Sequence, residues 1–417
     1  MSSQPVVRTL SEADADAVFD LDLWAFGFDP QYSENDEARR YLEWDRVAGA
    51  FVPDGTGERL GGVHAVLSLQ LPVPGGASIP AGGLTWVGVH PELRRRGLLT
   101  AMIRHHLDAV RDRGEPVSIL FAAEPAIYGR FGYGLATQSV KLTVGRGADL
   151  RDVPGADDLT VTFETADRER HGALVAEVFA AAGAARPGWA SRPDTTLGEA
   201  IFNLPPPHLR NSEPQRLLVA RDGAGAVRGY AFFVRKLDWQ DSGANGTTRV
   251  RELVALDAAA ARALWGRLLD LDLQTKVQVG RRPTDDPLLS LLVDARAASP
   301  TLHDELWLRL VDLPAALAAR RYPTDVDVVL EVTDALLPSN AGRWRLTGAA
   351  DGARCERTDD EPDLAVDVRD LGAAYLGGTT LTALAAAGLL TEQRAGALGK
   401  AAAAFSWPVA PHCGWGF

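Results

Sequence analysis

A short basic run in the first third of the chain combines three arginines with a glycine. The run Arg94-Arg95-Arg96-Gly97 follows an apolar segment expected as a strand, Leu84–Val89, and leads into an amphipathic segment. The first N–H groups of a helix have no acceptor within the helix and lie at the positive end of its dipole. Backbone N–H groups from Arg95 to Thr100 could therefore hold the oxygens of a pyrophosphate. Gly97 would let the backbone approach closely, and the arginines would add positive charge.

The segment after Gly97 is predicted to be a helix. Its apolar residues recur at helical spacing and would lie on one face, and Gly114 and Pro116 would end it. These apolar residues are Leu98, Leu99, Met102, Ile103, Leu107 and Val110. The arginine run alone fits a solvated basic face as well as it fits a phosphate-binding site. The strand before it and the tyrosine- and glycine-containing segment at residues 127–134 favour the phosphate-binding site.

A second distinctive segment follows this helix and the strand expected at Val117–Phe121. It reads Ile-Tyr-Gly-Arg-Phe-Gly-Tyr-Gly over residues 127–134. With the Arg94-x-x-Gly97 loop, it resembles the acetyl-CoA motif region of the GCN5-related N-acetyltransferases (GNAT), whose loop reads Arg/Gln-x-x-Gly-x-Gly/Ala. Leu99 departs from that pattern, because a small residue is expected there. The triple arginine and the Tyr-Gly segment narrow the resemblance to the Eis (enhanced intracellular survival) branch.

The resemblance implies where the co-substrate acetyl-CoA would bind. In the GNAT fold the signature strand and the next strand part, and the pantetheine arm lies between them. One backbone amide of the signature strand would polarise the thioester carbonyl. The resemblance places Val87, Gly88 and Val89 along the arm, and Ala123 and Glu124 facing it. It places Arg95, Arg96, Gly97, Leu98, Leu99 and Thr100 around the pyrophosphate. No metal is expected.

The catalytic groups implied by the resemblance are Tyr128 and the main-chain carboxylate of Phe417. A phenol is protonated at neutral pH and can donate a proton to a departing thiolate, whereas an ionised carboxylate can accept one from an ammonium, directly or through water. The chain ends on an aromatic, proline-containing segment, residues 405–417, which is unlike a frayed tail. From the residues alone, a tail that merely packs is the favoured interpretation.

Near the start of the chain, Ser11 and Asp14 predict the beginning of a helix that carries Val18, Leu21 and Phe26. Acidic and aromatic residues alternate around the end of this helix and in the loop after it, and they could line a pocket for an amine. The acidic residues are Asp29, Glu34, Asp36 and Glu37, beside Trp24, Phe26, Phe28 and Tyr32. A solvated acidic loop is the favoured alternative. Asp29, Glu34 and Glu124 are the other candidates for the base. His105 and His106 are adjacent in the predicted helix, so they would point in different directions, and a solvated or half-buried position is expected for them.

Composition limits the class of protein. The 417 residues carry a formal net charge of −12, which argues against a nucleic-acid partner. Two cysteines, Cys355 and Cys413, are too few for a disulfide framework and fit a reducing compartment. No stretch approaches the roughly twenty apolar residues of a membrane span, and no signal-peptide pattern opens the chain. A cytoplasmic protein without a membrane partner is predicted.

Three domains are predicted, in an α+β arrangement of two tandem GNAT-like domains, with mixed sheets and flanking helices, followed by a sterol-carrier-like α+β domain. The expected boundaries are 1–155 for the catalytic domain, 156–299 for a second GNAT-like domain and 300–417 for the third. In the second domain Asp257 stands where phosphate would bind, so that domain is expected to be catalytically silent. The third domain would supply the C-terminal carboxylate, and a lipid-binding role for it stays open.

The sequence therefore predicts an acyltransferase that moves an acetyl group from acetyl-CoA directly to an amine of a cationic small molecule, aminoglycoside-like or polyamine-like, or of a lysine side chain. The alternative is a non-enzymatic carrier or regulator that binds CoA or lipid. Family resemblance also implies a homo-oligomer, with a homohexamer expected.

Overall fold

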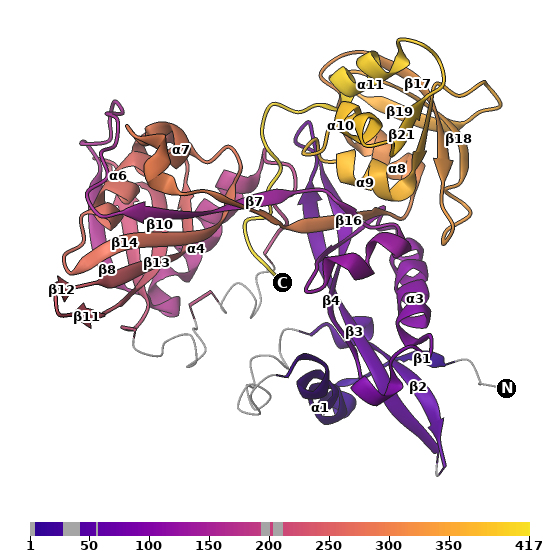
Figure 1. Cartoon of the computed structure of the whole chain (residues 1–417), viewed down its shortest axis with the longest axis horizontal. Coiled ribbons are helices and arrows are strands. Elements are labelled where there is room, and N and C mark those ends of the chain that lie inside the picture. Colours follow the sequence, from indigo (N-terminus) through magenta and orange to yellow (C-terminus); the bar gives the residue numbers. More distant parts are fainter. Residues whose placement is uncertain (1–4, 28–41, 56, 193–200, 203–211) are drawn as a thin grey trace. The chain divides into compact units, whose positions relative to one another are not determined.

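Two seven-stranded sheets and one five-stranded sheet form the framework of the described chain (Figure 1). This computed structural model describes residues 5–27, 42–55, 57–192, 201–202 and 212–417. The described chain divides into two units, of which the first joins residues 1–137 to 305–417 and the second comprises residues 138–304. No described helix combines the length and the apolar character that crossing a membrane requires.

The first sheet has the strand order β1-β2-β3-β4-β5-β16-β6, and it contains the strands predicted at Leu84–Val89 and Val117–Phe121. Neighbouring strands are antiparallel except β4 and β5, which are parallel and joined by helix α3. The strands are β1 (Val6–Thr9), β2 (Ala48–Asp54), β3 (Gly57–Pro72), β4 (Ser78–Val89), β5 (Val117–Phe121), β6 (Gly134–Leu135) and β16 (Leu306–Leu310).

Strands β4 and β5 part at their carboxyl ends. Their last paired residues are Leu84 and Leu120, whereas β4 continues to Val89. Trp86 has a φ of 55°, and the register between β3 and β4 shifts there, which marks a β-bulge. The parted strands are the arrangement that the GNAT resemblance implied.

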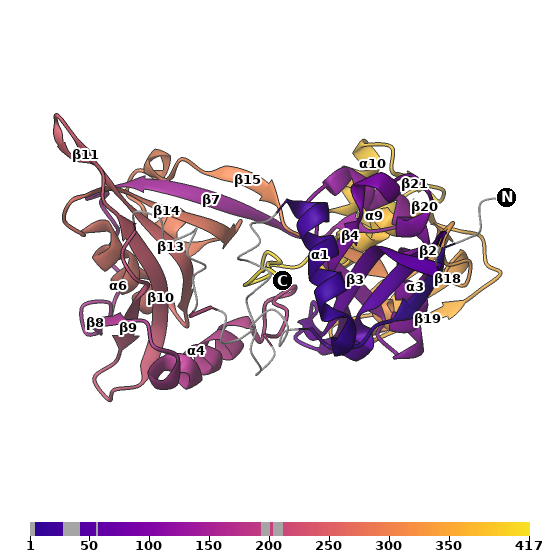
Figure 2. The ribbon, with the colours of Figure 1, turned by 90° about the horizontal axis from the view of Figure 1, so that it is seen from below.

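Two helices cover opposite faces of this sheet. Helix α1 (Ala15–Phe26) packs on Val63 and Ala65, whereas α3 (Leu98–Asp112) packs on Val66 and Leu84. The division follows from the alternation of side chains along a strand. Figure 2 shows α1 lying across β3 and β4. The predicted helix after Gly97 is confirmed, and it stops just before Gly114, whose φ is 71°.

The second unit repeats this plan. Its sheet has the order β15-β7-β14-β13-β10-β9-β8, and again one parallel pair, β13 and β14, is joined by a helix, α6. The strands are β7 (Gln138–Gly145), β8 (Thr160–Thr165), β9 (Arg216–Arg221), β10 (Val227–Lys236), β13 (Gly246–Ala255), β14 (Gln274–Pro283) and β15 (Thr301–Asp304), beside a small hairpin of β11 (Trp239–Gln240) and β12 (Gly243–Ala244). The helices are α4 (Arg168–Gly183), α6 (Ala258–Leu269) and α7 (Pro287–Leu291). The predicted second GNAT-like fold is thus present.

Three strands, β7, β15 and β16, lie in sheets other than those that the expected boundaries imply. Strand β15 belongs to the second sheet, although residues from 300 onward were expected in the third domain. Strand β7 pairs with β14 and β15, although residues 138–155 were expected in the first domain. Strand β16 pairs with β5 and β6, although it was expected to open the third domain. An alternating pattern identifies a strand but not its partner, and these partners are distant in sequence.

The five-stranded sheet has the order β19-β18-β17-β20-β21 and belongs to the first unit. The buried ion pair between Arg309 of β16 and Asp334, 2.6 Å long, and the contact of helix α9 with β16 tie it to the first sheet. Its strands are β17 (Val326–Thr333), β18 (Gly342–Gly348), β19 (Ala353–Arg357), β20 (Leu364–Asp367) and β21 (Leu390–Glu392), and its helices are α8 (Leu313–Ala319), α9 (Val368–Ala374), α10 (Leu381–Ala386) and α11 (Ala397–Phe405).

Candidate active site

The basic loop presents an open helix N-terminus. Gly97 adopts a φ of 84° and a ψ of 0° as the N-cap of α3, in the left-handed region that favours glycine. The N–H of Ala101 donates to the carbonyl of Gly97 at 3.0 Å. The N–H groups of Leu98, Leu99 and Thr100 therefore have no acceptor within the helix. Nothing lies within 4 Å of the position that a Cβ on Gly97 would occupy.

The charges around this N-terminus favour an anion. Arg94, Arg95 and Arg96 are exposed, and their side chains make no hydrogen bond or ion pair with any residue that the structure describes. The first turn of α3 contains no acidic residue. Because a helix N-terminus carries a partial positive charge, this loop can receive phosphate oxygens without displacing an internal partner.

The corresponding helix of the second unit is capped internally. The N–H of Ala260 donates to Oδ1 of Asp257 at 2.8 Å, and the guanidinium of Arg228 pairs with the same carboxylate. The hydrogen bonds to Ala260 and Arg228 outweigh desolvation and lower the pKa of Asp257. A carboxylate thus occupies the position that a phosphate would take.

The gap between the parted strands lies next to the basic loop in the chain. On the β3 side, Gly88 pairs with Val63 and Val89 with Gly62, whereas on the other side β4 has no β5 partner beyond Leu84. Val87 and Val89 are half-buried and Gly88 is buried. Ala123 and Glu124 are exposed just beyond the end of β5.

Tyr128 is a buried phenol that starts a short 3₁₀ turn, and 8% of its surface is exposed. Burial and, to a lesser degree, the charge of Glu124 raise its pKa to about 12, so it is protonated at neutral pH. Its ring meets that of Tyr133 edge-on at 5.9 Å. Tyr133 is fully buried, and its hydroxyl lies 2.7 Å from Oγ of Ser118.

The C-terminal tail is anchored by Glu305, a residue that the sequence did not single out. Its buried carboxylate accepts hydrogen bonds from the Thr137 hydroxyl at 2.8 Å and from the N–H of Cys413 at 3.1 Å. Nδ1 of His412 lies 3.0 Å from the same carboxylate. Glu305 precedes β16 without any local motif, so only the tertiary structure identifies this role.

The last residue lies against the central strands. A Cβ on Gly83 would lie 3.2 Å from the Phe417 ring, which also meets the rings of Phe121 at 5.2 Å and Trp415 at 5.4 Å. Trp415 is buried. The prediction that the tail docks into apolar surroundings is confirmed, and the catalytic use of its carboxylate stays a prediction.

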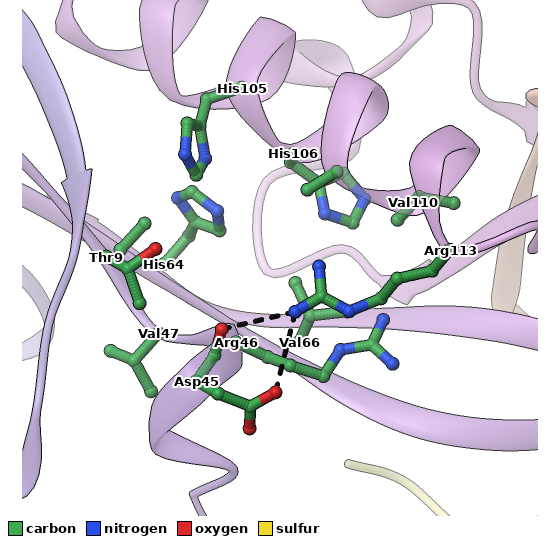
Figure 3. Close-up of a pocket in the computed structure, with 12 residues that line it drawn as sticks. Thr9, Asp45, Arg46, Val47, His64, Val66, His105, His106, Val110 and Arg113 are labelled. Carbon is green, nitrogen blue, oxygen red and sulfur yellow. Dashed lines mark hydrogen bonds and ion pairs between the residues drawn. The ribbon is translucent and has the colours of Figure 1, made fainter.

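A cavity of about 100 Å³ lies beside the C-terminal half of α3 and is lined by three histidines. Figure 3 shows His105 above His64, with His106 beside them and Arg46 and Arg113 below. Arg46 forms a buried bidentate ion pair with Glu115, at 2.6 and 2.7 Å. The α3 residues that line the cavity lie from His105 onward, whereas the basic loop precedes the first residue of that helix.

The expectation for His106 was wrong. His106 is fully buried. Its Nε2 lies 2.7 Å from Oγ of Ser118, and its ring meets that of His64 edge-on at 5.9 Å. Burial lowers the pKa of His106 and lowers that of His64 to about 3. No three or more His, Cys, Asp or Glu side chains in the described ranges are grouped to hold a metal ion.

Most of the acidic and aromatic residues that could line an amine pocket lie at positions 28–41. Asp29, Glu34, Asp36 and Glu37, together with Phe28 and Tyr32, lie outside the described residues. Trp24 and Phe26, at the end of α1, are described, and both are exposed.

Comparison with known families supports the layout. Residues 6–136 and 188–310 match acetyltransferase (GNAT) domain models, and residues 313–414 match a sterol carrier protein domain. These matches agree with two GNAT folds followed by a sterol-carrier-like domain.

Individual relatives are similar to this chain over most of its length. An uncharacterized N-acetyltransferase of Streptomyces coelicolor is 44% identical over 421 residues, covering 100% of both chains. N-acetyltransferase Eis of Mycobacterium tuberculosis is 35% identical over 361 residues and 85% of both chains. The crystal structure of Eis1 from Mycobacterium abscessus superposes with a TM-score of 0.82 at 36% identity, covering 99% of this chain and 100% of that one.

Proposed function

Because this chain belongs to the Eis family of GNAT N-acetyltransferases, we propose that it acetylates an amine of a cationic small molecule, aminoglycoside-like or polyamine-like, or of a lysine side chain. Acetyl-CoA, which GNAT enzymes use, is the donor. The observation that carries the proposal is the open N-terminus of α3, with three unpaired exposed arginines in front of it and the parted strands beside it.

The donor would bind with its pyrophosphate on the N–H groups of Leu98, Leu99 and Thr100, and with the side chains of Arg95 and Arg96 close by. Gly97 leaves the space for this approach. The pantetheine arm would follow Val87–Val89 between the strands, with Ala123 and Glu124 facing it. A backbone N–H of Val87–Val89 would hydrogen-bond the thioester oxygen as negative charge develops on it.

In the transfer step the amine nitrogen forms a bond to the thioester carbon, and the carbon–sulfur bond breaks. The Tyr128 hydroxyl is the proton donor to the departing sulfur. With a pKa of about 12, the phenol is a weaker acid than a thiol, whose pKa is about 8.5. The hydroxyl would therefore act first through a strong hydrogen bond to the developing thiolate, and the proton would follow as the thiolate separates.

The carboxylate of Phe417 would take the proton that the amine loses. A C-terminal carboxylate is ionised at neutral pH but is a weak base for an ammonium, so its action through a held water is favoured. Its anchoring through Glu305 and Phe121 supports this role, because a base must keep its position. Glu124 is exposed, and no described contact positions it better.

The rest of the chain has supporting roles in this proposal. The second GNAT-like domain is catalytically silent, because Asp257 and Arg228 occupy its helix N-terminus. The sterol-carrier-like domain supplies the C-terminal carboxylate. The enzyme works as a homo-oligomer, and six copies are expected from the family.

Thiol release from acetyl-CoA tests the proposal. The full-length protein is mixed with acetyl-CoA and with spermidine, an aminoglycoside or a lysine peptide, and the acetylated amine is identified by mass spectrometry. Amine-dependent thiol release with matching product is expected. Acetyl-CoA binding without turnover on any amine would instead support a non-enzymatic CoA-binding carrier.

A further inference from the structure

Helix α1 carries a buried carboxylate that lacks a partner. Asp22 is 7% exposed and sits on the apolar face of the helix beside Val18 and Leu21. Its carboxylate forms no hydrogen bond or ion pair with any residue that the structure describes. Burial alone raises its pKa to about 6. An unpaired buried charge costs folding free energy, so such a residue calls for an explanation.

Helical spacing places Asp22 over strand β4. Residues three and four apart share a helix face, so Asp22 lies between Phe19 and Phe26. The Phe19 ring meets that of Trp86 at 5.3 Å, and a Cβ on Gly88 would lie 3.7 Å from the Phe26 ring. Asp22 therefore faces β4 between Trp86 and Gly88, in the part of the strand that has parted from β5.

The C-terminal residue lies on the same face of the sheet. A Cβ on Gly82 would point at Val110 of α3, whereas a Cβ on Gly83 would point at Phe417. Side chains alternate along a strand, so Gly83 faces the side that α1 covers. Gly83 and Trp86 are three residues apart, or about 10 Å along a strand. Asp22 and the Phe417 carboxylate thus border the same side of the gap.

We propose that Asp22 is a cation-recognition residue of the acceptor site and pairs with an ammonium group of the amine substrate. This inference rests on the proposed acetyl transfer and names one residue that selects its substrate class. An ammonium would supply the missing partner, and the low polarity around the carboxylate would strengthen their attraction. Phe26, four positions further along the helix and 40% exposed, offers aromatic surface on which a cation can lie.

A matched pair of variants tests the proposal. Asp22→Asn keeps the shape and removes the charge, whereas Asp20→Asn removes an exposed charge two positions away on the same helix. With spermidine as acceptor, Asp22→Asn should raise the acceptor KM by about tenfold or more, as for one lost charge-assisted hydrogen bond. The acetyl-CoA KM and the melting temperature should not worsen. Asp20→Asn should leave all of these values unchanged.

Two results would overturn the inference. One is an unchanged spermidine KM in Asp22→Asn. The other is a parallel loss of acetyl-CoA binding and thermal stability in both Asp22→Asn and Asp22→Ser, because that would make Asp22 a structural residue. Either result leaves the proposed function standing if the wild-type protein acetylates spermidine. Absence of any amine-dependent turnover in the wild-type protein would remove the proposed function itself.

Discussion

The ring of Phe417 meets the ring of Phe121 edge-on, with centroids 5.2 Å apart and planes at 81°. Phe121 is the last residue of β5, the strand that parts from β4. The last residue of the chain is therefore fixed beside the gap in which the pantetheine arm is proposed to lie. Four residues earlier in the tail, the N–H of Cys413 donates a hydrogen bond to Glu305.

The position of the terminal carboxylate leads to the first prediction. Several residues appended after Phe417 should abolish amine acetylation, because they replace the carboxylate at that position with a peptide group. The same residues added before Met1 should be harmless. The measurements are turnover with a saturating amine, melting temperature and acetyl-CoA binding, and the last two should stay unchanged. Full turnover in the extended protein would exclude the Phe417 carboxylate as base.

A shortened chain gives a related result. Deleting Phe417 moves the terminus back by about 3.3–3.6 Å of extended chain and removes the ring that packs on Phe121. Turnover should fall severely. Phe417→Leu keeps the carboxylate in place, so it should lower turnover less than the C-terminal extension or the deletion of Phe417.

The phenol of Tyr128 carries the second prediction. Tyr128→Phe removes only the hydroxyl, so turnover should fall by about two orders of magnitude, the usual contribution of a general acid. Tyr133→Phe is the matched control, because it removes a buried hydroxyl bonded to Ser118. That change should lower stability by about 1 kcal/mol and leave the chemical step largely intact. An effect of Tyr128→Phe on the acceptor KM alone would make Tyr128 a binding residue.

The third prediction concerns the cofactor loop. Gly97→Val should raise the acetyl-CoA KM strongly, because the new side chain would fill the space that pyrophosphate needs. Valine is also strained at a φ of 84°, so Gly114→Val is the control. Gly114 lies beyond the other end of α3, with a φ of 71° and nothing within 4 Å of a Cβ, so it imposes similar strain away from the loop. Equal acetyl-CoA KM values in the two variants would exclude the loop at Gly97 as the pyrophosphate-binding site.

Local features were predictable from sequence, and long-range partners were not. The apolar spacing of residues 98–110 predicted α3, because the residues that form one face of a helix lie only three or four positions apart in the sequence. Likewise, Asp257 before a run of alanines predicted a capped helix. Glu305, by contrast, binds Thr137 and Cys413, which are distant in sequence, and no local pattern marks it.

The burial of individual polar residues could not be predicted from the sequence either. Asp22 and His106 occur in amphipathic helices, where a polar residue is expected at the surface. The sequence could not reveal that His106 forms a hydrogen bond with Ser118, or that α1 packs with Asp22 toward β4. The unpaired carboxylate and the histidine cluster became visible only once the helices were packed on the first sheet.

The fourth prediction is that acid destabilises the first unit through His64. Burial is the main cause that lowers its pKa to about 3, whereas an unfolded histidine titrates near 6.5. Below pH 6.5 the unfolded chain binds a proton that folded His64 does not, so the free energy of unfolding falls as pH is lowered, until about pH 3. The loss from His64 alone should reach about 2 kcal/mol at pH 5.

His64→Gln should therefore flatten the decline of melting temperature between pH 7 and pH 5, because glutamine does not titrate. Part of the decline should remain, since burial also lowers the pKa of His106. The exposed His303 provides the control, and His303→Gln should keep the full wild-type slope. A wild-type slope in His64→Gln would show that the acid sensitivity arises elsewhere.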